Sequence, residues 1–203
     1  ENTQFAALNG KIYFNAYTPA NGYELWSTDG TTEGTQIVKD IFPGQAGSSI
    51  SALTALNNYL MFAANDGTRS YNTVWKSDGT PAGTFELKDV NMNQDSSMNL
   101  GFAELNNKVF FPAGYNSLNG VELWSTDGTT ANTSLFKDIF HKYSGITNFE
   151  DSAVLADKLI YNGNMGDGTR PFVTDGTIAG THIISPTAPA GSSYTKAGNY
   201  VFY

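Results

Sequence analysis

The stretch ELWSTDGTTEGT at residues 24–35 decides the fold, because it returns three more times along the chain. Its copies are TVWKSDGTPAGT at 73–84, ELWSTDGTTANT at 122–133 and RPFVTDGTIAGT at 170–181. The aspartates of the shared DGT triplet stand 49, 49 and 48 residues apart, at Asp29, Asp78, Asp127 and Asp175. A fixed period of this length indicates a repeat architecture.

Each repeat reads as four short β-strands. A first strand rich in small residues ends at a tight turn such as Asn9-Gly10, whose residue types tolerate positive φ. The second strand is an unbroken apolar run, as in residues 60–62, which predicts burial on both faces. After a longer polar loop, the third strand carries the ELW segment, and the DGT turn joins it to the fourth strand.

Four antiparallel strands in about 49 residues match one blade of a β-propeller. We therefore predict an all-β, propeller-type fold with four blades, and the rival architecture is a solenoid. The chain is predicted to be a single repeat domain, 1–203, with repeats of about 1–48, 49–97, 98–145 and 146–192. Residues 193–203 resemble the first two strands of a partial fifth repeat, so strand is predicted at 200–203. Its partner would be the first repeat or a further repeat of a longer chain.

Composition narrows the function. The net charge is −8, which disfavours nucleic acid and anionic lipid as partners, because both require clustered Lys and Arg. No apolar run is long enough to cross a membrane as a helix. There is no cysteine, and the sequence lacks both the HExxH pattern and an EF-hand loop. We therefore expect no cofactor and assign no metal ligand, although weak calcium binding through Asp66, Asp95 or Asp167 stays open.

The repeated segment resembles the bacterial repeat named after its consensus, ELWxxDGT. The match is close at 24–31 and 122–129, weaker at 73–80, and weakest at 170–177, where Arg-Pro-Phe replaces Glu-Leu-Trp. Because the period runs from end to end, the resemblance covers essentially the whole chain. It implies a propeller-like module of a secreted or surface-attached bacterial protein, often found beside adhesion modules. It implies no particular substrate.

The repeated polar and aromatic residues have structural interpretations. Each DGT aspartate is expected to accept backbone N–H bonds within its own turn. The large rings are expected to pack between blades rather than to present sugar-stacking platforms; they are Trp26, Trp75, Trp124 and Phe172. The aspartate of the Lys-Asp pair that ends three repeats is predicted to bind backbone amides of a neighbouring blade. These aspartates are Asp40, Asp89 and Asp138.

The variable loops after the second strand are the candidate binding surface, because loops carried on a rigid scaffold commonly hold binding residues. Solvated loops without a ligand are an equally good interpretation. The candidate ligand-binding residues are of types that grip sugars or peptides: Tyr17, Asn21, Asp66, Arg69, Tyr115, Asn116, Asn119, Asp167 and Arg170. No catalytic residue is predicted.

The sequence thus favours a non-catalytic, extracellular or cell-surface recognition or adhesion module. Its expected partner is a surface glycan or a protein, and the chain itself is expected to be part of a longer chain or assembly. Two alternatives stay open. One is a structural spacer in a giant surface protein, and the other is an extracellular polysaccharide hydrolase or lyase. The carboxylates available to such an enzyme in the first strands are Glu104, Glu150 and Asp151. They would have to lie about 5 to 10 Å apart across a cleft.

Overall fold

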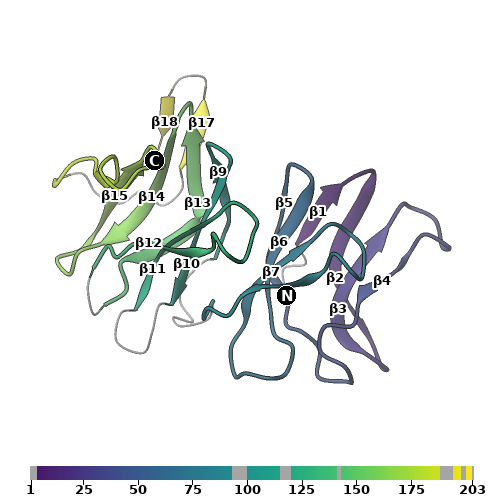
Figure 1. Cartoon of the computed structure of the whole chain (residues 1–203). Coiled ribbons are helices and arrows are strands. Elements are labelled where there is room, and N and C mark those ends of the chain that lie inside the picture. Colours follow the sequence, from purple (N-terminus) through teal and green to yellow (C-terminus); the bar gives the residue numbers. More distant parts are fainter. Residues whose placement is uncertain are drawn as a thin grey trace. The chain divides into compact units, whose positions relative to one another are not determined.

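The computed structural model describes residues 4–92, 100–114, 120–140, 143–187, 194–197 and 200–202, and it is all-β throughout these residues (Figure 1). Each repeat forms one four-stranded antiparallel sheet with its strands in chain order, which confirms the predicted blades. Among the described residues, none lies in a helix long and apolar enough to cross a membrane.

The blades are numbered in chain order. Blade 1 comprises β1 (Phe5–Leu8), β2 (Lys11–Thr18), β3 (Gly22–Thr28) and β4 (Gln36–Lys39). Blade 2 comprises β5 (Ser51–Leu56), β6 (Tyr59–Ala64), β7 (Thr73–Ser77) and β8 (Phe85–Lys88). Blade 3 comprises β9 (Ala103–Leu105), β10 (Lys108–Gly114), β11 (Val121–Thr126) and β12 (Ser134–Lys137). Blade 4 comprises β13 (Ile146–Leu155), β14 (Lys158–Asn164), β15 (Thr169–Thr174) and β16 (His182–Ile183).

The chain divides into two compact units. Residues 1–92 hold blades 1 and 2, and residues 93–203 hold blades 3 and 4. The second unit also contains the hairpin of β17 (Thr195–Ala197) and β18 (Tyr200–Phe202). The partial fifth repeat therefore forms strands, as predicted, over the residues that are described there. The strand at Tyr200–Phe202 pairs with β17 of the same partial repeat.

The tight turns between the first and second strands have the backbone that their residues predict. Asn9 and Gly10 have φ of 51° and 75°, and Asn106 and Asn107 have φ of 52° and 61°. Two consecutive residues of positive φ define the type I′ turn, whose twist matches that of the flanking strands. In blades 1 and 3 the turn residues therefore fix the register of the first hairpin, whereas the turns of blades 2 and 4 have one residue of positive φ each, Asn57 and Ala156.

Every blade has two faces, because successive side chains in a strand point to opposite sides. In blade 1 the leading face carries Phe14 and Trp26, which are directly opposite each other. The trailing face carries Tyr13 and Leu25. In the first unit the trailing face of blade 1 packs on the leading face of blade 2 in one apolar core: Ala6, Leu8, Tyr13, Leu25, Val38, Ile41, Leu53, Leu60, Phe62, Ala64 and Trp75.

The second unit repeats this arrangement. The trailing face of blade 3, with Phe110 and Leu123, shares one apolar core with the leading face of blade 4, with Tyr161 and Phe172. Tyr161 and Phe172 stack with ring centroids 5.7 Å apart. The predicted packing of the third-strand ring between blades is thus confirmed at Trp75 and Phe172.

The expectation that every second strand is buried on both faces is wrong for blade 1. Leu60, Met61 and Phe62 of blade 2 are 0% exposed, as predicted, but Ile12 of blade 1 is 39% exposed and Phe14 is half-buried. Leu60 and Phe62 lie in the apolar core that blades 1 and 2 share, whereas Ile12 and Phe14 lie outside that core. Trp26 is likewise only half-buried, and its buried Nε1 has no hydrogen-bond partner in the part of the chain that the structure describes.

A lysine at the end of the fourth strand fastens each blade to the next one within its unit. The Nζ of Lys39 donates to the carbonyl oxygen of Thr84 at 2.6 Å, at the end of the DGT segment of blade 2. Lys137 makes the equivalent bond to the carbonyl oxygen of Thr181 in blade 4. The repeated lysine therefore serves the contact between blades.

The DGT glycine provides a matched test of this packing. Gly79 and Gly30 have similar φ, 91° and 93°, but a Cβ on Gly79 would lie 2.1 Å from the Tyr13 hydroxyl. A Cβ on Gly30 would meet nothing within 4 Å. Both alanine variants carry the strain of positive φ, so Gly79→Ala should cost about 1–2 kcal/mol more than Gly30→Ala in chemical unfolding. Equal losses would contradict the described packing of blade 1 on blade 2.

Candidate functional site

The DGT turns are built as the sequence predicts. Asp29 Oδ1 accepts the backbone N–H of Thr31 at 3.0 Å and the Thr31 hydroxyl at 2.7 Å. The same pair of bonds recurs at Asp78, Asp127 and Asp175. The side-chain bond from the threonine, followed by the backbone bond, lowers the pKa of Asp29. The carboxylate is therefore charged and engaged within its own turn.

Blade 3 departs from this pattern at one position. In the other blades a glycine follows two residues after the DGT-X segment, and a Cβ on Gly34 would lie 2.0 Å from Asp29 Oδ1. In blade 3 this residue is Asn132, whose Nδ2 donates to Asp127 Oδ2 at 2.6 Å. Both carboxylate oxygens of Asp127 are thus occupied by groups of its own turn.

The candidate loop of blade 1 is bonded to its own blade. The Nδ2 of Asn21 donates to Asp40 Oδ2 at 2.8 Å. Tyr17 is exposed and lies against Tyr23, with ring centroids 5.2 Å apart. Asn21 is therefore held by a structural bond, whereas Tyr17 presents its ring to solvent.

The candidate loop of blade 2 is organised around Arg69. Its guanidinium binds Asp89 through Nε at 2.9 Å and through Nη2 at 3.0 Å, and Glu86 through Nη1 at 3.2 Å. The Tyr71 hydroxyl also donates to Asp89 Oδ1, at 3.1 Å. Asp66 closes a small turn by accepting from the backbone and hydroxyl of Thr68, at 2.9 and 2.6 Å. The polar groups of Arg69 and Asp66 thus form bonds that fix the shape of this loop.

The candidate loop of blade 4 has its own internal ion pair, between Arg170 and Asp167. The Arg170 Nε also donates to the carbonyl oxygen of Pro186 at 2.9 Å. The three candidate residues of blade 3, Tyr115, Asn116 and Asn119, lie outside the described residues. The structure therefore brings Asp66 to Arg69 in blade 2 and Asp167 to Arg170 in blade 4, each pair within its own loop.

These loops also correct our interpretation of the Lys-Asp aspartates. We predicted that they bind backbone amides of a neighbouring blade. Asp40 and Asp89 instead accept bonds from side chains of their own blade, Asn21 and Arg69, and Asp89 is exposed rather than partly buried. The cause is the bulge in the fourth strand, which places the lysine opposite Leu25 in blade 1 and Val74 in blade 2 and leaves the aspartate beyond the pairing. In these two blades the aspartate therefore anchors the variable loop.

The glutamate of the ELW segment has a role that the sequence did not reveal. Glu24 is 0% exposed and accepts the backbone N–H groups of Ile41 and Phe42, at 2.9 and 3.0 Å. Glu122 is equally buried and accepts from Ile139 at 2.5 Å and from Gly145 at 3.3 Å. Burial raises the pKa of both carboxyls, and it raises the pKa of Glu122 to about 8. The apolar neighbours of these glutamates were the available signal for their burial.

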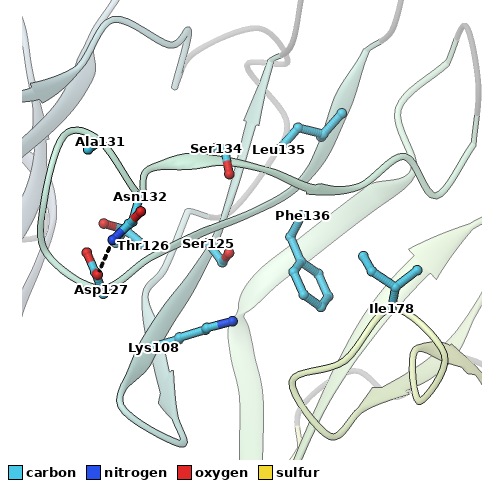
Figure 2. A pocket seen from close by; sticks show the side chains of 10 residues that line it. All are labelled: Lys108, Ser125, Thr126, Asp127, Ala131, Asn132, Ser134, Leu135, Phe136 and Ile178. Atoms are coloured by element: carbon cyan, nitrogen blue, oxygen red, sulfur yellow. Dashed lines mark hydrogen bonds between the residues drawn. The ribbon is translucent and has the colours of Figure 1, made fainter.

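A pocket of about 420 Å³ lies in the second unit, between the outer hairpin of blade 3 and the DGT turn of blade 4 (Figure 2). One wall is apolar and is formed by Phe136 and Ile178. The other wall is polar and includes Lys108, Ser125 and Ser134. Figure 2 shows the Phe136 ring and the Lys108 side chain entering the same space from different strands. Our sequence reasoning did not find this pocket, because its walls come from two repeats.

The described residues offer no cluster of three or more His, Asp or Glu side chains that would hold a metal ion. The first-strand carboxylates considered for an enzyme do not line the pocket. The chemistry that the pocket offers is a hydroxyl-lined and cationic wall opposite an apolar one, which is suited to binding.

Comparison with known proteins supports the fold. The chain matches no sequence-family profile and no curated protein. Among solved structures, a puromycin hydrolase S511A mutant complexed with PGG is similar, with a TM-score of 0.60, 14% identity, and 93% of this chain and 29% of that chain covered. The β-propeller domain of the trilobed protease from Pyrococcus furiosus has a TM-score of 0.55, 12% identity, and coverages of 93% and 56%.

TolB from Acinetobacter baumannii is also similar, with a TM-score of 0.56 and 10% identity, over 97% of this chain and 46% of that chain. This chain therefore spans between 29% and 56% of the length of these three structures. The four-stranded blades, together with this likeness, define the chain as a protein of the β-propeller class. At these identities the likeness concerns the fold alone.

Proposed function

We propose that the chain is a non-catalytic recognition module that binds a surface glycan or a partner protein in an extracellular setting. The observation that carries the proposal is that the repeated polar groups make structural bonds within the scaffold. The DGT aspartates close their own turns, the ELW glutamates bind backbone, and the Lys-Asp pairs tie blades and loops. Such a scaffold leaves ligand contact to the side chains that differ between blades.

The resemblance to ELWxxDGT repeats supports a bacterial surface location for this module. The similar structures include a puromycin hydrolase and a protease propeller domain, so hydrolysis is the activity against which the proposal is tested. A structural spacer is the second candidate, and the internal bonding of Arg69 and Arg170 favours it over binding at those two loops.

The test is a glycan-array and hydrolase-activity screen on the purified chain. We expect weak binding of a glycan without turnover, since single sites of this kind gain strength from multivalency. Arg69→Ala, Arg170→Ala and Tyr17→Ala are the loop variants, and Glu33→Ala, at an exposed position outside the candidate loops, is the control. Loss of binding in the arginine variants would place the ligand at the loops. Turnover of any substrate would overturn the non-catalytic proposal, and absence of all binding would favour the spacer.

A further inference from the structure

The pocket beside blade 3 has the chemistry of a sugar site. We propose that it binds one pyranose residue that carries a carboxylate, as a uronic acid does. This inference rests on the proposed recognition function and names its ligand class. Ligand pockets in proteins commonly measure about 300–1,000 Å³ and combine apolar walls with a few polar groups. The volume of about 420 Å³ accommodates a monosaccharide unit with its neighbour in a chain.

The apolar wall is fitted to the C–H face of a pyranose ring. Phe136 is half-buried, and Phe110 holds its ring edge-to-face, with centroids 5.0 Å apart and planes at 86°. Ile178 adds an exposed apolar side chain from the neighbouring turn. The position of Phe136 is taken by Val38 in blade 1 and Leu87 in blade 2, so the aromatic wall is particular to blade 3.

The polar wall has unused hydrogen-bonding capacity. Ser125 and Ser134 stand directly opposite each other on β11 and β12, and their hydroxyls make no bond with the described part of the chain. The place of Ser134 is held by Gln36, Phe85 and His182 in the other blades. The small serine therefore opens the space that these larger side chains fill elsewhere, and the two hydroxyls face it.

The charge of the pocket selects a carboxylated sugar. Lys108 is exposed and forms no hydrogen bond or ion pair with the described residues, so its ammonium is available to an anion. Asp127 is the carboxylate that lines the pocket, and both its oxygens are engaged by Thr129 and Asn132. Because Lys108 is exposed to water and shares the pocket with Asp127, its attraction for an anionic ligand is modest and sensitive to salt. The sugar carboxylate would meet Lys108, and the ring hydroxyls would meet the two serines.

Blade 1 supplies the matched control. Lys11 opens β2 as Lys108 opens β10, but the positions facing it hold Gln36 and Val38 instead of Ser134 and Phe136. Lys11→Ala therefore removes the same charge without touching the proposed site. Ser134→Gln places the blade 1 side chain in the pocket, at an exposed position where the fold does not depend on the serine.

The experiment titrates the full chain with trigalacturonate and with maltotriose as the neutral probe, by calorimetry and by protein NMR. We expect trigalacturonate to bind, with an affinity that falls about tenfold in Phe136→Leu and in Lys108→Ala, and is lost in Ser134→Gln. Lys11→Ala should leave it unchanged, and added salt should weaken it. Thermal unfolding of each variant verifies that the fold is retained.

The outcomes separate this site from the function itself. Equal binding of maltotriose would overturn the choice of a carboxylated sugar. Glycan binding that survives Lys108→Ala and Ser134→Gln would overturn the pocket while leaving the recognition function intact. If the array shows no glycan bound by the wild-type chain, then the recognition of glycans and this site fail together.

Discussion

Replacing Trp75 with alanine should lower the free energy of unfolding by about 3–5 kcal/mol, a large share of the roughly 5–15 kcal/mol that stabilises a typical domain. Trp75 is 5% exposed in the apolar core between blades 1 and 2, and it stacks on Phe62 with centroids 6.5 Å apart. Its Nε1 donates to the Thr73 hydroxyl at 3.0 Å. Alanine would leave a cavity in this core and would remove the donor to that buried hydroxyl, which keeps a longer bond of 3.5 Å to the carbonyl oxygen of Ala64.

Trp26 is the matched control, because it occupies the same position in blade 1. It is half-buried, it lies outside the core that blades 1 and 2 share, and its Nε1 finds no hydrogen-bond partner among the described residues. Trp26→Ala should therefore cost less than about 2 kcal/mol. Urea unfolding followed by circular dichroism measures both variants. A similar loss for the two tryptophans would show that contact between the blades contributes little, and a neutral Trp75→Ala with lost ligand binding would make Trp75 a platform residue.

The fold could be predicted because its determinants are local and repeated. The DGT aspartate, the threonine that it binds and the asparagines of the tight turns act over two or three residues, so their pattern reports the structure directly. The exposure of Ile12 could not be predicted in this way. The second strand of blade 1 has the same apolar pattern as that of blade 2, but only the blade 2 strand places its leading face in the core that the two blades share.

The candidate site was less accessible to sequence reasoning because its groups are brought together from separate segments. Arg69 and Asp89 are 20 residues apart, and their bond shows that a residue chosen for ligand binding shapes its own loop. The pocket joins Phe136 to Ile178 of the next repeat. Its sequence signal is that Ser134 and Phe136 of blade 3 differ in size from the residues at the equivalent positions of the other blades. These positions can be recognised as equivalent only after the strand register aligns the repeats.

The buried ELW glutamate is the second position where a large effect is expected. Glu122→Ala should destabilise the chain by about 3–5 kcal/mol, because it leaves the backbone N–H groups of Ile139 and Phe140 without their acceptor. The Gly145 N–H loses its bond to Glu122 but also donates to the carbonyl oxygen of Val121 at 2.9 Å. Glu122→Gln keeps an acceptor oxygen in the same place, so it should retain most of the stability at neutral pH.

The same residue predicts a pH dependence whose sign follows from burial. The pKa of Glu122 is raised from 4.5 to about 8 in the folded chain, so the folded state keeps a proton that the unfolded state releases. The stability contributed by this proton is complete below about pH 4.5 and is lost as the pH rises toward 8. Within this window the free energy of unfolding should fall by up to about 1.4 kcal/mol per pH unit relative to Glu122→Gln.

Comparing the wild type with Glu122→Gln separates the effect of this proton on stability from the effect of the DGT aspartates. The lowered pKa values of those aspartates contribute stability that is lost as the pH falls into the acidic range. Urea unfolding at several pH values from 4 to 9, with the exposed Glu33→Gln as control, measures the difference. A difference between wild type and Glu122→Gln that stays constant from pH 5 to 8 would show that the carboxyl ionises normally. In that case the three backbone N–H groups would be stabilising a buried carboxylate rather than a neutral acid.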